Sequence, residues 1–293
     1  MDYSTLPTVS ALSDCVSIAQ LDQIKVIRVD HPHASAAISL FGGHVLSYTP
    51  QAGQDLIWMS EQAKFDGQTA IRGGIPICWP WFGRIHAPAH GFARNSDWEL
   101  IEHRENEHGV MIELALFASE ATHDIWPHLF DARLLIEVGK QLTVTFKVMN
   151  IDDTPWRFSG ALHSYLNIGD IHQAQTQGLG NQYIDSLADN QVCSSDGTLK
   201  LIGSVDRVYT QPEAVIKIED PELKRTVCVD NQGHNSAVVW NPWSEGAQAM
   251  ADMQDNGFET MLCVESTVHA NSLDAGAELK PGESHTLVTR LSV

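Results

Sequence analysis

Apolar and polar residues alternate in short runs along almost the whole chain. A period of two places every second side chain on one face, which is typical of half-buried β-strands. Two of the breaks between runs, 106–109 and 139–141, combine glycine with polar residues and are typical of hairpin turns. The runs that we predict to be strands are 24–29, 36–41, 55–59, 98–103, 110–117, 132–138, 142–150, 156–163, 214–218, 226–230, 237–240, 260–265 and 286–292.

Helical patterns are few and short. The best candidates predict helices over 10–21 and 119–126. Because helices do not alternate with the strands, a parallel sheet with crossover helices is disfavoured. Many short strands at roughly even spacing favour a sandwich or a barrel. No linker, charge run or internal repeat divides the chain, so we expect a single domain over residues 1–293.

Composition and charge narrow the class of function. Hydrophobic residues make up 43% of the 293 residues, which excludes low-complexity disorder and allows a sizeable core. There are 18 basic and 37 acidic residues, a net charge of −19. A chain this acidic repels nucleic acid and anionic lipid, so we expect neither as a partner. A small anionic substrate would need a local cationic pocket.

Cysteine usage and the first residues of the sequence indicate the cellular compartment of the protein. The five cysteines are widely spaced without a CxxC pair, which indicates neither a disulfide framework nor a zinc site. Positions 1–15 lack the basic and apolar regions of a signal peptide, and no apolar run is long enough to span a bilayer. We therefore expect a reduced, cytoplasmic protein. We also expect a monomer, although no feature of the sequence determines the oligomeric state.

The segment 71–95 differs from the rest of the chain because it is rich in proline, glycine and aromatic residues. No acidic residue occurs between 67 and 96, whereas Arg72, Arg84 and Arg94 fall inside. We predict a long ordered loop outside the sheet core, and such loops are usually functional. The adjacent glycines at 73 and 74 would let the backbone approach a ligand. A guanidinium fits a phosphate bidentately, but it can equally bind loop carbonyls, and the residues alone leave both readings open.

The same segment contains Trp79, Trp81, Phe82 and Phe92. Flat aromatic rings stack on the C–H faces of sugars, and Trp81 is our candidate for such a contact. The alternative is that these rings pack the loop itself.

Two further residues could transfer protons. His163 lies at the end of a predicted strand, and Glu265 follows an apolar run, where burial would raise the pKa of its carboxyl and make it a usable base. Taken singly, each is more often an ordinary structural residue. The histidine pairs at 31 and 33 and at 86 and 90 lack the remaining ligands or the spacing of a metal site, so we expect no metal.

Several motifs in order resemble the hexose-6-phosphate mutarotases (glucose-6-phosphate 1-epimerases) of the aldose 1-epimerase (galactose mutarotase-like) superfamily, and most closely the bacterial branch of that family. The motifs are IRGGIPICWPWFG, HGFARN, ALHSYLNIGDI, DRVY, VVWNPW and CVES, and the resemblance runs from about residue 25 to the C-terminus. It implies one large antiparallel β-supersandwich with few short helices. It also implies interconversion of the α and β anomers of a hexose 6-phosphate, with glucose 6-phosphate as the expected substrate, and no metal or organic cofactor. The segment 1–20 has no counterpart in the motifs and is expected to be peripheral.

The resemblance also implies roles for individual residues. They are His163 as acid, Glu265 as base, His90 as a second active-site histidine, Asp206 as a sugar ligand, and Arg72 and Arg94 as phosphate ligands. Two other functions stay open. A mutarotase for neutral aldoses would need no phosphate ligands, and a non-catalytic sugar-phosphate-binding sandwich would need neither His163 nor Glu265.

Overall fold

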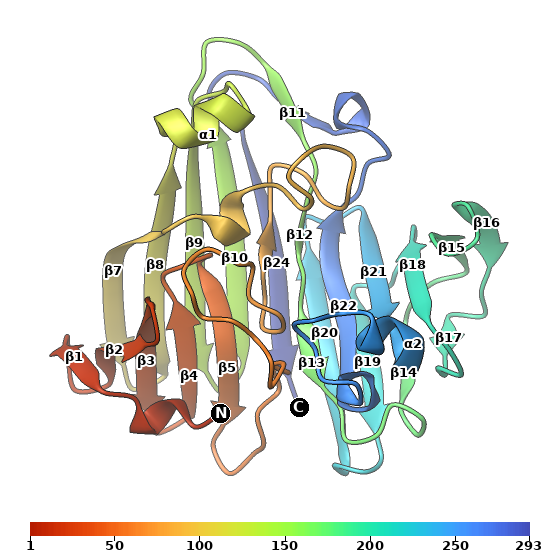
Figure 1. Ribbon diagram of the computed structural model, residues 1–293, viewed down its shortest axis with the longest axis horizontal. Coiled ribbons are helices and arrows are strands. Elements are labelled where there is room, and N and C mark those ends of the chain that lie inside the picture. Colours follow the sequence, from red (N-terminus) through yellow and green to blue (C-terminus); the bar gives the residue numbers. More distant parts are fainter.

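The computed structural model describes residues 1–293 and consists mainly of antiparallel strands in three large sheets (Figure 1). A nine-stranded sheet forms the shared back layer. A five-stranded sheet packs on one half of it, through contacts of β3 with β8 and of β4 with β9, and an eight-stranded sheet packs on the other half, through contacts of β22 with β20 and β24. This arrangement confirms the expected all-β supersandwich.

The five-stranded sheet is a meander of the first strands in the chain. Its strands are β1 (Thr8–Ala11), β2 (Val16–Leu21), β3 (Ile24–His31), β4 (Ala34–Ser39) and β5 (His44–Pro50). The helix expected over 10–21 is wrong, because β1 and β2 form a hairpin here. All of β2 pairs in register with β3, so backbone hydrogen bonding to a ready strand outweighs the weak helical spacing.

The nine-stranded sheet confirms both expected hairpins. In order along the chain its strands are β7 (Glu99–Asn106), β8 (Gly109–Phe117), β9 (Phe130–Gly139), β10 (Leu142–Asn150), β14 (Gln175–Gln177), β17 (Thr198–Leu199), β19 (Val215–Asp220), β20 (Arg225–Gln232) and β24 (Ser284–Ser292). Every second residue of β9 is buried, as the alternation predicts. The tight turn after Asn106 and the turn between β9 and β10 fall where glycine indicates them.

The eight-stranded sheet carries the candidate site. Its strands are β6 (Ile77–Cys78), β12 (Gly160–Leu162), β13 (Tyr165–Asn167), β15 (Gln182–Asp185), β16 (Gln191–Ser194), β18 (Val205–Tyr209), β21 (Ser236–Asn241) and β22 (Met261–Val268). All residues of β22 are buried, because it lies in the middle of the sheet and faces a packed layer. A separate two-stranded sheet joins β11 (Trp156–Phe158) to β23 (Ala277–Leu279). The strand expected over 55–59 forms only isolated bridges at Ile57 and Met59.

Helices are few, and α1 (Glu120–Ile125) confirms the one expected over 119–126. Ser119 caps it, and Thr122 completes a capping box. The second helix, α2 (Trp243–Gln248), has no counterpart among the sequence predictions. No helix in the structure is long and apolar enough to cross a membrane. The remaining helical turns are η1 (Tyr3–Thr5), η2 (Ala93–Asn95), η3 (Gly257–Thr260) and η4 (Leu273–Ala275).

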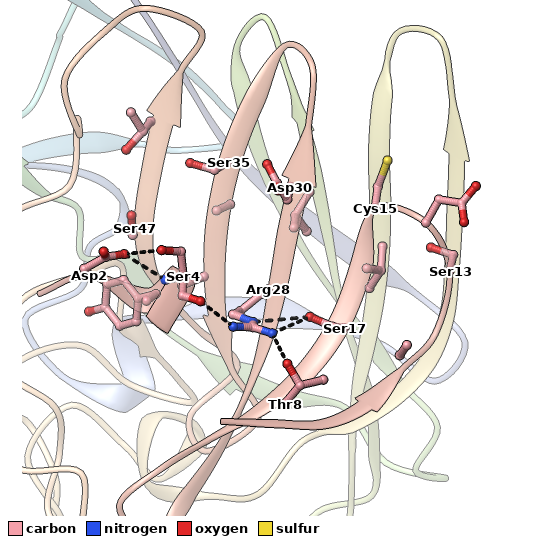
Figure 2. A pocket seen from close by; sticks show the side chains of 18 of the residues that line it. Asp2, Ser4, Thr8, Ser13, Cys15, Ser17, Arg28, Asp30, Ser35 and Ser47 are labelled. Carbon is pink, nitrogen blue, oxygen red and sulfur yellow. Dashed lines mark hydrogen bonds between the residues drawn. The ribbon is translucent and has the colours of Figure 1, made fainter. Parts of the chain in front are cut away.

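The N-terminal segment lies against the five-stranded sheet and borders a hollow of about 770 Å³ (Figure 2). Arg28 fixes this segment by donating hydrogen bonds to the carbonyl oxygens of Ser4 and Leu6 and to the hydroxyls of Thr8 and Ser17. The guanidinium is therefore fully used in holding the chain terminus. The segment 1–20 thus contains β1, which is an edge strand of the five-stranded sheet, and nearly all of β2.

Candidate active site

The segment 71–95 is a long loop, but much of it is core. Strand β6 pairs with β12 inside the eight-stranded sheet, so the expectation that this segment stays outside the sheet is wrong. Trp79 has no exposed surface and packs edge-to-face against Phe92, Trp126 and Phe130. Proline and glycine bend the chain so that its aromatic side chains fill the space between the layers.

Trp81 belongs to the same packing. Its side chain has no exposed surface, and its indole N–H donates to the carbonyl oxygen of Pro88 at 2.6 Å. No face of this ring is open to a sugar, so the structure does not support the expected stacking contact. Phe82 lies at the site instead: it is half-buried, with its ring centroid 5.1 Å from that of His90 and 6.3 Å from that of His163.

The two glycines after Arg72 serve packing rather than ligand approach. Gly73 and Gly74 adopt φ values of +106° and +72°. A Cβ on Gly74 would lie 2.2 Å from Nε2 of His44, and one on Gly73 would lie 2.6 Å from the carbonyl oxygen of Trp58. The close approach is therefore to neighbouring protein groups, which corrects the expected role. These close contacts fix the backbone next to Arg72.

His163 and Glu265 face each other across paired strands. Leu162 pairs with Ser266 and Tyr165 with Cys263, so this register sets His163 opposite Glu265. The imidazole Nδ1 lies 3.4 Å from the carboxylate Oε1. His163 is 8% exposed and Glu265 only 1%, and neither Nδ1 nor the second carboxylate oxygen, Oε2, has a hydrogen-bond partner. The sheet thus holds a buried imidazole and a buried carboxyl close together, each with unused hydrogen-bonding capacity.

Three further residues, Tyr165, Trp240 and Cys263, complete the floor of the site. The ring of Tyr165 stacks on His163 at 4.7 Å with an interplanar angle of 5°. Trp240, on β21, meets both rings edge-on. Cys263 is fully buried beside Glu265. Sequence reasoning missed these three residues, although the period of two from His163 and Glu265 was enough to place Tyr165 and Cys263 on the same face.

Arg72 reaches the site but already has partners. It donates to the hydroxyl of Tyr165 at 2.9 Å and pairs with Asp252 at 3.2 Å, while its Nε is buried and unpartnered. Burial opposes the charged form, but Tyr165 and Asp252 more than compensate and raise the pKa of Arg72. Its charge is therefore permanent and partly neutralised. Asp252 lies far along the sequence in the loop after α2, and no local pattern indicated it.

Arg94 is held by its own loop. It donates to the carbonyl oxygen of Ala89 at 3.0 Å, and its Nε is also buried without a partner. One nitrogen of Arg94 therefore binds a loop carbonyl, which is one of the two readings that the sequence left open, and its Nε donor stays unused. Arg84 is exposed.

His90 is a neutral hydrogen-bond donor beside His163. Its ring centroid lies 5.8 Å from that of His163, and its Nδ1 accepts a hydrogen bond from the backbone N–H of Gly83 at 3.3 Å, which leaves the proton on Nε2. Burial, reinforced by the charges of Arg94, Arg72 and Arg84, lowers the pKa of His90 to about 3. The residue also has a φ of +65°, a conformation that costs roughly 1–2 kcal/mol for a residue with a side chain.

Asp206 lies on β18, opposite Trp240 of β21. Burial raises the pKa of its carboxyl. Its charge in turn contributes to the raised pKa of Glu265, so the two carboxyls lie within electrostatic reach of each other. Of the residues proposed from the sequence, the structure thus gathers His90, His163, Asp206, Glu265 and the two arginines around one face of the eight-stranded sheet.

Burial acts in opposite directions on the two central groups. It lowers the pKa of His163, assisted by His90, Arg94 and Arg72, and it raises the pKa of Glu265, assisted by Asp206. Both shifts favour the uncharged forms, in which the carboxyl carries a proton and one nitrogen of the imidazole has a free lone pair. A pair with one proton and one free lone pair can act as acid and base together.

Comparisons with known proteins identify the family of this chain. Residues 25–292 match the Aldose 1-epimerase family. A Salmonella typhimurium protein, provisionally named glucose-6-phosphate 1-epimerase, is 40% identical over 280 residues, which cover 94% of either chain. An Escherichia coli protein with the same provisional name is 37% identical over 280 residues with the same coverage.

Solved structures show the same architecture. The crystal structure of YeaD from Salmonella typhimurium, provisionally described as a mutarotase, has a TM-score of 0.93 at 36% identity and covers 99% of this chain and 97% of its own. The crystal structure of HI1317 has a TM-score of 0.85 at 30% identity, with coverage of 98% and 99%. Fold and matches together define a carbohydrate isomerase built on a β-supersandwich. The chain belongs to the aldose 1-epimerase family, whose reaction is the interconversion of sugar anomers.

Proposed function

We propose that this enzyme interconverts the α and β anomers of a hexose 6-phosphate, and that glucose 6-phosphate is its first substrate. The observation that carries the proposal is the buried His163–Glu265 pair, 3.4 Å apart and incompletely hydrogen-bonded, within electrostatic reach of Arg72 and Arg94. The relatives' names support the phosphorylated substrate. We further propose that the chain acts as one domain, in the cytoplasm, without a cofactor.

In this reaction the enzyme needs only to transfer protons. A base takes the proton of the C1 hydroxyl, the O–H electron pair forms the C1 carbonyl, the bond from C1 to the ring oxygen breaks, and an acid protonates that oxygen. The aldehyde then rotates about C1–C2, and the freed hydroxyl attacks the other face with acid and base exchanged. Two groups that share one proton, such as His163 and Glu265, return to their starting state after each turnover.

We assign His163 as the acid and Glu265 as the base in ring opening, so the proton must first move from carboxyl to imidazole. Arg72 and Arg94 are among the causes that lower the pKa of His163. A phosphate dianion bound to these arginines would offset their charge and favour imidazolium. The neutral His90 would donate to a sugar oxygen through Nε2, and Asp206 would accept from a sugar hydroxyl.

One observation favours a second substrate class, the neutral aldoses: Asp252 already neutralises part of the charge of Arg72. The deciding experiment is exchange spectroscopy by NMR on the anomeric signals of glucose 6-phosphate and of glucose, with and without the protein. We expect much faster exchange for the phosphate ester. Equal acceleration of both sugars would favour neutral aldoses, and no acceleration of either would refute the proposed function.

A further inference from the structure

The buried thiol of Cys263 has no part in the proposed reaction. Cys263 lies two positions before Glu265 on β22, so both side chains point to the same face of the sheet. Its sulfur, a ring nitrogen of His163 and a carboxylate oxygen of Glu265 all lie within 4.8 Å of one another. A thiol, an imidazole and a carboxylate gathered in this way are three of the ligands that zinc prefers.

The spacing of the cluster suits a tetrahedral ion. With zinc–nitrogen and zinc–oxygen bonds of about 2.0–2.2 Å, two tetrahedral ligand atoms lie about 3.4 Å apart. Nδ1 of His163 and Oε1 of Glu265 are 3.4 Å apart. Nδ1 also lacks a hydrogen-bond partner, so it need not break an existing bond to bind an ion. The thiol lies within 4.8 Å of a ring nitrogen of His163. It would have to approach further to reach the tetrahedral nitrogen–sulfur separation of about 3.6 Å.

Charge also favours a soft divalent ion here. Zinc bound by a thiolate, a carboxylate and a neutral imidazole forms a complex without net charge, which lowers the cost of burying it. Thiolate and imidazole select zinc over magnesium or calcium. Arg72 and Arg94 repel a cation, but Asp252 offsets Arg72, and the carboxyl of Asp206 lies within electrostatic reach of Glu265.

We propose that His163, Cys263 and Glu265 bind Zn²⁺ with a fourth position open to solvent, and that zinc reversibly inhibits the enzyme. Zinc and sugar phosphate are mutually exclusive, because the ion occupies the lone pairs of the acid and the base. The inhibitory part of this inference rests on the proposed function, whereas zinc binding does not.

The first test is inhibition of anomer exchange, measured by NMR at free zinc concentrations fixed with a chelating buffer. We expect inhibition competitive with glucose 6-phosphate. The substitution Cys263→Ser should weaken it at least about tenfold relative to the zinc-free rate of the same variant, since even groups that only support a metal ligand are worth roughly 10–100-fold in affinity. Cys78→Ser is the matched control, because Cys78 is equally buried on β6 but lies outside the cluster, and its inhibition should match the wild type.

The second test needs no turnover. Cobalt(II) replaces zinc in a protein whose three half-exposed cysteines, Cys15, Cys193 and Cys228, are changed to serine. A thiolate-to-cobalt absorption band should appear and should vanish with Cys263→Ser, or with Cys263→Ala if the serine variant does not fold. Absence of the band, or equal zinc inhibition with and without Cys263, overturns the zinc site while leaving mutarotation standing. A band in a protein without mutarotase activity confirms zinc binding and refutes the proposed function alone.

Discussion

Removal of the Arg72 side chain should slow the reaction of phosphorylated sugars much more than that of neutral sugars. In Arg72→Ala the proposed phosphate ligand is lost, and Asp252 is left without its partner. We expect kcat/KM for glucose 6-phosphate to fall steeply. The slower reaction of glucose should change little, because that substrate has no group for the arginine to bind.

The magnitude follows from the contacts. A hydrogen bond to a charged group is worth about 1.5–3 kcal/mol, which corresponds to roughly a ten- to hundredfold loss. The unpaired carboxylate of Asp252 adds repulsion of up to about 1 kcal/mol, limited by solvent because its side chain is 22% exposed. Arg94 donates to a backbone carbonyl and leaves no carboxylate behind, so Arg94→Ala should cost less than Arg72→Ala.

The assay is NMR exchange for both sugars in a double-mutant cycle with Asp252→Asn. In the Arg72→Ala background, Asp252→Asn should recover a few-fold of the lost activity toward glucose 6-phosphate, because it removes the unpaired charge. Arg157→Ala is a control, since Arg157 forms an exposed pair with Glu278 and should leave both rates unchanged.

Two results would refute this reasoning. If Arg72→Ala slowed glucose as much as its phosphate ester, Arg72 would act through Tyr165 on His163 and not on phosphate, and the neutral-aldose function would gain support. If Asp252→Asn recovered nothing, the carboxylate would not oppose the substrate.

Four further outcomes are expected. His163→Ala and Glu265→Gln should each lose on the order of 10²-fold or more in exchange rate, with thermal melting showing a folded protein; near-normal rates would contradict the assignment. Exhaustive chelator treatment should leave activity unchanged, and a loss restored by added metal would overturn cofactor-free catalysis. Phosphite dianion should accelerate exchange of glucose in the wild type but not in Arg72→Ala, and equal acceleration in both would exclude the arginine as its binding group. Burial lowers the pKa of His44 to about 4 from 6.5, so as the pH falls through this window only the unfolded chain takes up the proton. The free energy of unfolding, measured by urea titration, should therefore drop by up to about 3 kcal/mol more in the wild type than in His44→Gln. An identical pH dependence of the two proteins would contradict this prediction.

The parts of the fold that could be predicted are those with local signals. The hairpin of β9 and β10 has alternating side chains and a glycine turn, and both follow from neighbouring residues. The prediction for β1 and β2 was wrong because a short amphipathic stretch fits both the helical period of 3.6 and the strand period of two. Pairing of β2 with β3 determines that this stretch is a strand. β5 was missed because its consecutive buried residues show no alternation.

The residues of the candidate site likewise fall into two groups, those that a local sequence motif indicates and those that only the fold brings together. His163 and Glu265 stand in recognisable motifs, whereas Asp252 meets Arg72 only through tertiary folding, since most of the chain's strands lie between them in the sequence. The acid-free segment 67–96 indicated a cationic pocket, but other segments contribute Asp252, Asp206 and Glu265 to the same site. A local absence of acids therefore predicted where the arginines gather but not the net charge around them.

The net charge around the site bears directly on how the proposed reaction could be selective. A neutral His163 cannot protonate a ring oxygen, and burial together with two nearby arginines lowers the pKa of His163 and so favours its neutral form. A ligand that brings negative charge to those arginines removes one cause of the lowered pKa, whereas an uncharged sugar removes none. Binding of phosphate and protonation of His163 would then be coupled, so the 6-phosphate would contribute to the chemical step as well as to affinity. In this scheme selectivity arises in kcat as well as in KM, without any residue that contacts both the phosphate and C1.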